Sequence, residues 1–307
     1  METLLQQLIN GIVLGAVYAL VALGYTMVYG ILGLINFAHG EVVMVGAMVT
    51  LAVIKLLAGT GLPLTVQLLI ALGVSIPACM ALGAGIERIA YRPLRNAPRL
   101  APLITAIGVS IVLQYLVVLI WGRGYHPYPE LLPTAAIDIA GARISPAQIT
   151  IVLFSAVMMA ALLWLVHHTR LGRAMRATAE NPAVARLMGV NVNHVITMTF
   201  VIGSALGAMA GVLVSINYSV AHYQMGFMLG LKAFTAAVLG GIGNLGGAMV
   251  GGLLLGLIEA LCSGYSGYVT GGVLGSNYRD VFSFLVLIVV LIFRPSGLLG
   301  ERVAERA

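Results

Sequence analysis

The candidates for chemistry in this sequence are charged and polar side chains that stand inside strongly apolar segments. Lys232 lies twelve residues before Asn244, and Glu259 lies fifteen residues after it, in a stretch that is otherwise free of charge. If the chain turns near Asn244, the two charged side chains reach a similar depth on adjacent helices and form an ion pair. Each could instead extend separately to the membrane surface and keep its charge in water. Ionisable residues inside membrane helices are typical of transport pathways. Lys232 and Glu259, with Asn244 at the turn between them, are therefore candidate pathway or gate residues.

A second polar group interrupts a long apolar run nearer the N-terminus. Asn36, His39 and Glu41 stand together between two apolar segments. These side chains could line a gate where a helix is broken. They could equally satisfy the backbone groups that such a break frees, because lipid offers no hydrogen-bond partners. Both interpretations stay open at this point.

The sequence lacks the patterns for ATP binding, metal binding and nucleophilic catalysis. The only lysines, Lys55 and Lys232, are followed by Leu and Ala, and no GxxxxGK[ST] motif exists. The six histidines are scattered except for the pair His167–His168, and no GxSxG motif is present. We therefore predict no enzymatic activity, no cofactor and no metal site for this chain.

The composition indicates a membrane protein. Sixty per cent of the residues are hydrophobic and only 8% are charged, which is far from the average of soluble domains. The net charge of +6 would suit a nucleic-acid partner. However, the arginines gather in two loops and at the C-terminus, a distribution typical of cytoplasmic loops. We therefore exclude nucleic acid as a partner and expect contact with the lipid bilayer.

The apolar segments predict an all-α polytopic helical bundle. A membrane helix needs about 20 apolar residues, and several segments reach this length. We expect about eight or nine transmembrane helices with broken or re-entrant hairpins, in a single domain over residues 1–307. The apolar segments are residues 5–35, 42–57, 64–86, 101–121, 149–166, 195–216, 227–261 with a break at 240–247, and 281–293.

Two basic loops define the expected orientation. Residues 87–99 and 170–194 each carry four arginines, and two apolar segments separate the loops. Because positive loops stay in the cytoplasm, both loops should lie on that side. The N-terminus and residues 122–148 and 263–277 should then lie outside. The arginines are Arg88, Arg92, Arg95 and Arg99 in the first loop, and Arg170, Arg173, Arg176 and Arg186 in the second.

The second basic loop carries the signals of a short helix. Asn181 can cap it, Pro182 suits its first position, and Gly189 can adopt the left-handed conformation that ends it. The resulting helix is about 10 Å long, or two turns. A capped basic helix on the cytoplasmic side could press against a partner protein. It could also be an amphipathic connector that lies on the lipid surface.

Small residues predict close helix packing. Gly11 and Gly15 are four residues apart, as are Gly203, Gly207 and Gly211. Such spacing lets helices approach closely in membranes, so both stripes are expected to be packing seams.

The two interrupted apolar stretches resemble each other. Residues 29–48 and 235–254 both run from an apolar segment through a break with Gly and Asn into a segment of small residues. An internal duplication would place them symmetrically, as in many transporters. A general preference for small residues in membrane helices could produce the same likeness.

Four long motifs carry a family resemblance over essentially the whole chain. They closely resemble the permease subunit of bacterial branched-chain amino-acid ABC importers, of the LivH type. The motifs are INFAHGE (35–41), IERIAYRPLR (86–95), RLGRAMRATAENPAVARLMGVN (170–191) and KAFTAAVLGGIGNLGGAMVGGLLLGLIEAL (232–261).

The resemblance implies a multi-pass protein of the bacterial inner membrane. It also implies a second permease subunit of the LivM type, two ABC ATPase subunits and a periplasmic amino-acid-binding protein as partners. Permeases for urea, amides and other amino acids share these motifs, so the resemblance leaves the substrate open among them.

The resemblance gives the loop 170–194 a role in coupling to the ATPase. Glu180, Ala183 and Gly189 match a cytoplasmic coupling motif that is similar to the EAA loop of ABC permeases. The expected coupling residues are Arg176, Glu180, Pro182, Ala183, Arg186 and Gly189.

Substrate should enter from the outer loops, 122–148 and 263–280. We expect an apolar pathway without a tight binding site, because the sequence shows no paired intramembrane charges suited to an amino-acid zwitterion. The rival hypothesis is a self-sufficient secondary transporter or channel that uses Glu41, His39 or Glu259 for coupling.

Overall fold

The computed structural model describes residues 2–95, 97–98, 100–129, 136–139, 141–269, 271 and 278–300. Arg99, Arg302 and Arg306, and residues 130–135 and 272–277 of the predicted outer loops, lie outside the described residues. The helices are α1 (Glu2–Leu32), α2 (His39–Leu57), α3 (Leu64–Ile86), α4 (Leu100–Trp121), α5 (Pro146–His168), α6 (Arg170–Glu180), α7 (Pro182–Leu187), α8 (Val192–Tyr218), α9 (Met225–Gly240), α10 (Leu245–Val269) and α11 (Arg279–Phe293).

The predicted all-α membrane bundle is confirmed. Seven of the described helices are long and apolar enough to cross a membrane, and α9 and α11 are shorter, with 16 and 15 residues. Each predicted apolar segment is helical, and the predicted break at residues 240–247 divides the segment 227–261 between α9 and α10. A π-helical turn, Glu87–Tyr91, and a 3₁₀ turn, Arg92–Leu94, continue α3 into the first basic loop.

Short strands, which the sequence analysis did not predict, occupy the outer connections. β1 (His126–Pro127) pairs antiparallel with β4 (Val220–Ala221), and β2 (Ile137–Ile139) pairs antiparallel with β3 (Ala142–Ile144). The first pair ties the segment between α4 and α5 to the connection between α8 and α9, whereas the second is a hairpin within the α4–α5 segment.

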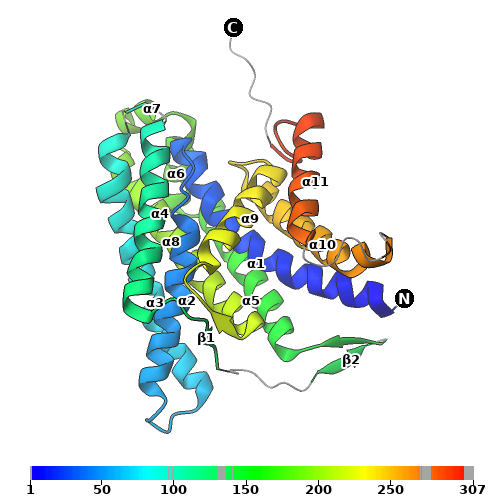
Figure 1. Ribbon diagram of the computed structural model, residues 1–307. Helices are drawn as coiled ribbons and strands as arrows, with labels where there is room; N and C mark the ends of the chain where they lie inside the picture. Colours follow the sequence, from blue (N-terminus) through cyan, green and yellow to red (C-terminus); the bar gives the residue numbers. More distant parts are fainter. Residues whose placement is uncertain are drawn as a thin grey trace.

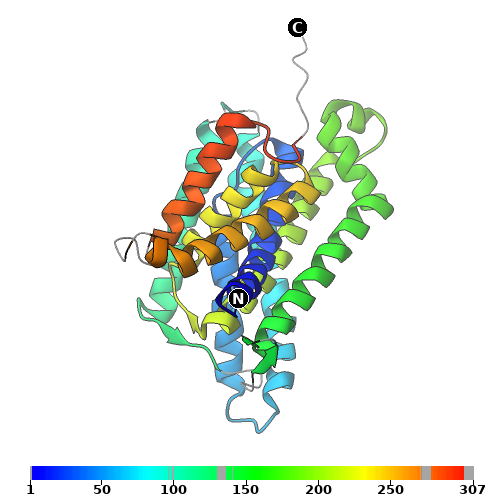
Figure 2. The same cartoon turned by 90° about the vertical axis from the view of Figure 1, so that its right-hand side faces the viewer.

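Helix α1 runs through the middle of the bundle and is the most deeply buried of the seven long helices (Figure 1). α8, α9, α10 and one face of α5 pack against it, whereas the membrane-length stretches of α3, α4 and α5 are only 22–28% buried. Figure 2 shows α5 at one edge of the bundle, with α6 and α7 at its end.

The two basic loops lie at the same end of the bundle, as predicted. Arg95 donates a hydrogen bond to the side chain of Asn193 (2.6 Å), and Arg92 donates one to Thr197 (3.0 Å). Figure 1 shows α7 and the end of α11 at the top and the turn between α2 and α3 at the bottom. Both basic loops therefore share the end of the bundle that carries α7. That this end faces the cytoplasm remains a prediction.

Backbone-to-backbone packing joins α1 to α10. A Cβ atom on Gly15 would lie 2.7 Å from the Cα of Leu253, and one on Gly11 would lie 2.8 Å from the Cα of Leu257. On the facing helix, a Cβ on Gly256 would overlap the backbone nitrogen of Gly15. The predicted close approach at the first glycine stripe is confirmed.

The second glycine stripe is a seam between α8 and its neighbours α1 and α2. A Cβ on Gly211 would overlap the backbone oxygen of Val43. Gly203 is less confined, because a Cβ there would lie 3.6 Å from the backbone of Gly24. The predicted seam is therefore present, and Gly211 is its tightest point.

The two helix breaks lie side by side. Gly33 ends α1 with φ +63°, and Gly241 and Gly243 connect α9 to α10 with φ +107° and +99°. A Cβ on Gly30 would lie 3.5 Å from the carbonyl oxygen of Gly243. The expected turn of both hairpins at one end of the bundle is confirmed, whereas their common origin remains a prediction.

The contact between α1 and α10 should be sensitive to a single methyl group. We expect Gly256→Ala to lower the free energy of unfolding by about 1–3 kcal/mol, because overpacking forces the two backbones apart. The measurement is thermal unfolding of the purified chain in detergent.

Gly108→Ala is the matched control. Gly108 is an exposed glycine of α4 with open space around it, so this substitution should leave stability unchanged or raise it by up to about 1 kcal/mol through helix propensity. Equal stability of the two variants would contradict the assigned role of Gly256.

Candidate functional site

Helix α6 holds the second basic loop, residues 170–194, against the end of α5. The hydroxyl of Thr169 accepts a hydrogen bond from the backbone nitrogen of Gly172 (3.0 Å) and donates one to the carbonyl of Leu165 (2.6 Å). Arg176 donates a hydrogen bond to the carbonyl of Val166. The sequence analysis treated this stretch as loop and missed α6, although Thr169 is a capping residue of the kind that begins helices.

The short helix α7 has the predicted caps. The side-chain oxygen of Asn181 accepts hydrogen bonds from the backbone nitrogens of Ala183 (3.0 Å) and Val184 (3.1 Å). Pro182 takes the first helical position, and Gly189 has a φ of +83° just after the helix. The local prediction for this helix is confirmed.

The surface of α7 is apolar on its outer side. Val184, Leu187 and Met188 are 52%, 86% and 80% exposed, whereas Ala185 faces inward and is buried. Exposed apolar patches of this kind mark contact sites for proteins or membranes. The predicted coupling residues Glu180, Pro182, Ala183, Arg186 and Gly189 are exposed around this patch.

An inner cavity connects α6 to both helix breaks. It has a volume of about 100 Å³ and is lined by Met175 and Arg176 of α6, Gly30 of α1, and Gly243. Arg176, one of the predicted coupling residues, therefore lies between the short helix α7 and the breaks. A displacement of α6 would change the shape of this cavity.

Glu87 organises a buried ionic cluster in the first basic loop. Its carboxylate is fully buried and accepts hydrogen bonds from Arg92 (2.9 Å and 3.2 Å), Arg95 and the hydroxyl of Thr197 (2.9 Å). The cluster joins the end of α3 to the start of α8. The sequence analysis missed it, although Glu87 is the only acid of the first basic loop.

The polar residues of the first break bind side chains of other helices. The side-chain oxygen of Asn36 accepts a hydrogen bond from the hydroxyl of Tyr91 (3.0 Å). One carboxylate oxygen of Glu41 accepts hydrogen bonds from Ser110 (2.9 Å) and Gln114 (2.7 Å) of α4. α2 begins at His39, so the break is shorter than expected and Glu41 lies in the first helical turn.

His39 and Glu41 are both buried within the bundle. The ring of His39 packs edge-on against Tyr25 at 5.0 Å and occupies the space that a side chain at Gly24 would need. The hydrogen bonds of Glu41 go to side chains of α4 and not to the backbone of the break, so Glu41 gives that interpretation no support. The role of His39 and Glu41 as gate residues remains a prediction.

Asn244 supports the backbone of the second break. Its side-chain oxygen accepts from the backbone nitrogen of Gly247 (3.0 Å), and its amide donates to the carbonyl of Leu299 (2.9 Å). The backbone nitrogens of Leu298 and Leu299 in turn donate to the carbonyls of Leu239 and Gly240 (both 2.9 Å). The segment after α11 thus closes over the break.

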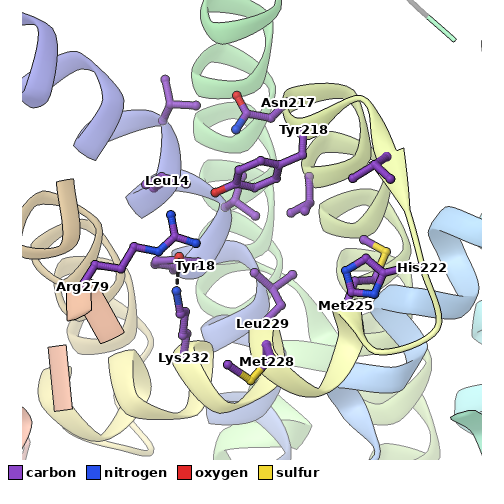
Figure 3. Close-up of a pocket in the computed structure, with 14 residues that line it drawn as sticks. Leu14, Tyr18, Asn217, Tyr218, His222, Met225, Met228, Leu229, Lys232 and Arg279 are labelled. Atoms are coloured by element: carbon purple, nitrogen blue, oxygen red, sulfur yellow. Dashed lines mark hydrogen bonds between the residues drawn. The ribbon is translucent and has the colours of Figure 1, made fainter. Parts of the chain in front are cut away.

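Lys232 and Glu259 form the predicted ion pair. The ammonium of Lys232 lies 2.7 Å from the carboxylate of Glu259 and 2.7 Å from that of Asp280. The Nε atom of Arg279 lies 3.3 Å from Glu259, and Tyr18 donates a hydrogen bond to Glu259 (2.9 Å). Tyr18, Lys232 and Arg279 of this cluster line a cavity, which Figure 3 shows.

The sequence analysis expected no set of charges suited to an amino-acid zwitterion, and the structure adds Arg279 and Asp280 to the predicted pair. The sequence analysis did not assign a role to Arg279 or Asp280, because they stand at the start of the last apolar segment, distant in sequence from Lys232. Among the described residues, no group of three His, Cys, Asp or Glu side chains lies together to hold a metal ion.

Comparison with known proteins gives matches over nearly the whole chain. Residues 7–291 match the family described as the permease component of the branched-chain amino acid transport system. The chain is 48% identical to the high-affinity branched-chain amino acid transport system permease protein BraD of Pseudomonas aeruginosa, over 98% of this chain and 97% of the relative.

Two further relatives extend the match. LivH of Escherichia coli, described in the same words as BraD, is 47% identical over 98% of this chain and 97% of the relative. A probable branched-chain amino acid transport permease of Methanocaldococcus jannaschii is 26% identical over 95% of this chain and 91% of the relative. The chain is therefore a multi-pass membrane protein that belongs to the family of branched-chain amino acid transport system permease components.

Proposed function

We propose that this chain is a translocating subunit of an ATP-driven importer for leucine, isoleucine and valine. The assignment of the substrate rests on the sequence identity of 47–48%, over nearly the full length, to high-affinity branched-chain amino acid permeases. The exposed apolar patch of α7 supports attachment to a separate ATPase. The chain itself has no GxxxxGK[ST] motif, so hydrolysis would belong to that partner.

The complete importer would hold further subunits in the bacterial inner membrane. We expect a second permease, two ATPase subunits that contact the α7 side, and a periplasmic protein that delivers the amino acid to the opposite end. ATP-driven movement of the ATPases would displace α7 and α6, and the inner cavity beside Gly30 and Gly243 would open or close in response.

Uptake by vesicles tests the proposal against the secondary-transporter hypothesis. Vesicles with the chain, its partners and ATP should import radiolabelled leucine, isoleucine and valine. Vesicles with this chain alone should import none under a proton or sodium gradient. Gradient-driven uptake without an ATPase would favour the secondary-transporter hypothesis. Import of urea or amides, without import of branched-chain amino acids, would show that the assigned substrate is wrong.

The orientation of α7 can be measured by thiol labelling. In a background with Cys79 and Cys262 replaced by alanine, Ala183→Cys should react with a membrane-impermeant reagent only from the cytoplasmic side, because α7 shares its end of the bundle with both basic loops. Labelling from the periplasmic side alone would show that the predicted orientation is inverted and would rule out the proposed coupling role of α7.

The apolar patch of α7 should be required for ATPase attachment. We expect Leu187→Glu to lower leucine uptake at least about tenfold, because an apolar anchor at an interface often contributes 2 kcal/mol or more, roughly a thirtyfold factor. The ATPase should no longer co-purify with the tagged chain, while the amount of chain in the membrane stays unchanged.

Leu56→Glu is the matched control. Leu56 is 81% exposed near the end of α2, at the opposite end of the bundle, so its substitution should leave ATPase co-purification unchanged. Full co-purification with Leu187→Glu would refute the assigned interface.

The cap of α7 should also matter for coupling. Asn181→Ala removes two hydrogen bonds and about 1 kcal/mol of helix stability, so we expect a several-fold slower uptake. Asn181→Asp keeps a capping oxygen and should retain most of the activity. A loss that is equal in both variants would mean that the cap is not the reason for the effect.

A further inference from the structure

Two cavities in the outer half of the bundle meet at the side chain of Arg279. The larger has a volume of about 330 Å³, and the smaller about 220 Å³. Both lie far from α7, because Tyr218, which lines both, ends α8, roughly 40 Å along that helix from its start beside α7. The residues that line both are Val13, Leu14, Asn217, Tyr218 and Arg279.

The larger cavity has an aliphatic wall and a basic edge. Figure 3 shows Lys232 and Arg279 on the left of the cavity, Tyr218 and Asn217 above it, and Leu229, Met225 and Met228 below and to the right. Its volume is near the lower end of the range for small-molecule sites, which suits a ligand of few atoms. The aliphatic wall is formed by Leu14, Val17, Val214, Met225, Met228 and Leu229.

The smaller cavity has mostly polar side chains. It is lined by Gln7, Asn10, Glu259 and Ser263, together with the shared Arg279. A molecule that lies beside Arg279 therefore has the aliphatic wall and Lys232 on one side, and Glu259 with the neutral polar side chains on the other.

Of the two cations in this cluster, Arg279 has the more accessible side chain for a ligand. Lys232 is 9% exposed and already contacts two carboxylates at 2.7 Å. Arg279 is 42% exposed, and its closest approaches to Glu259 and Asp280 are made through Nε. Figure 3 shows the outer edge of its guanidinium directed toward the cavity. A guanidinium edge of this kind can bind a carboxylate with two parallel hydrogen bonds.

The charge of the cluster favours a zwitterion over a simple ion. Lys232 and Arg279 balance Glu259 and Asp280, so the cluster has no net charge. An incoming anion or cation would leave an uncompensated charge beside a cluster in which Glu259 is fully buried, which is costly. An amino acid brings one charge of each sign and keeps the balance.

We propose that this junction is a binding site of the permease for a zwitterionic amino acid with a branched aliphatic side chain. The carboxylate of the ligand binds Arg279, its ammonium faces Glu259 and the polar cavity, and its side chain fills the aliphatic cavity. The identity of the ligand rests on the proposed function, whereas the site rests on the two cavities and the charge cluster.

Ligand-observed NMR can test the site without the binding protein. The full chain, with its partner subunits in nanodiscs, is mixed with millimolar L-leucine, and saturation transfer to the ligand is measured. We expect transfer chiefly to the methyl protons, because they contact the aliphatic wall. L-Isoleucine and L-valine should compete, whereas 3-methylbutylamine, which lacks the carboxylate, should not.

Two variants and a control assign the contacts. Arg279→Gln should raise the dissociation constant at least about tenfold, as expected for a lost charge-assisted hydrogen bond. Leu14→Trp should fill the cavity and weaken binding while the charge cluster stays intact. Lys55→Gln removes an exposed lysine outside both cavities, at the end of α2, and should leave binding unchanged.

The outcomes separate this site from the proposed function. Absence of saturation transfer in a preparation that imports leucine with its binding protein and ATP would overturn the site and leave the function standing. Unchanged binding in Arg279→Gln or in Leu14→Trp would overturn the assigned placement. Binding of leucine without import of any branched-chain amino acid would overturn the function and keep the site.

Discussion

Close backbone packing between α1 and α10 is the contact on which the rest of the structure depends. Inside a membrane, helices gain little from the hydrophobic effect and associate through tight van der Waals contact at small residues. Gly15 and Gly256 bring the two backbones together, and Tyr18 and Glu259 lie three residues further along each helix. Because helical side chains lean toward the N-terminus of their own helix and these helices are antiparallel, Tyr18 and Glu259 lean toward each other. The glycine contact thus positions the charge cluster at the outer cavity.

Local signals in the sequence were sufficient for some elements. The caps of α7 depend on Asn181, Pro182 and Gly189, which are neighbours in the chain, and the structure has all three in their expected places. The pair between Lys232 and Glu259 could be predicted because a single turn fixes their relative depth. Hydrophobic segments likewise predicted the helices, since the length of a membrane helix follows from the thickness of the bilayer.

Contacts between distant segments could not be predicted in the same way. Glu87 meets Thr197 across more than a hundred residues, and Asp280 meets Lys232 only because α11 returns to the same end as the start of α9. The helix α6 was missed for another reason: its polar surface resembles a loop, and its stability comes from bonds to the end of α5. Arg279 and Asp280 join the predicted pair of Lys232 and Glu259 through tertiary packing, which the spacing of residues along the chain does not reveal. The sequence therefore predicted the pair but not the complete cluster of four charges.

A helix as short as α7 could not transmit force on its own. Isolated helices of this length are unstable in water, because the hydrogen bonds of two turns do not offset the unfavourable free energy of helix nucleation. The structure compensates on the N-terminal side: Asn181 caps α7, and Thr169 and Arg176 fix the preceding helix to the end of α5. If α7 is the contact for an ATPase as proposed, α5, α6 and α7 would move together, and the part of α6 that lines the inner cavity would move with them. A push on α7 would then reach the two helix breaks, where Gly30 and Gly243 lie side by side, instead of being lost in the fraying of a single short helix.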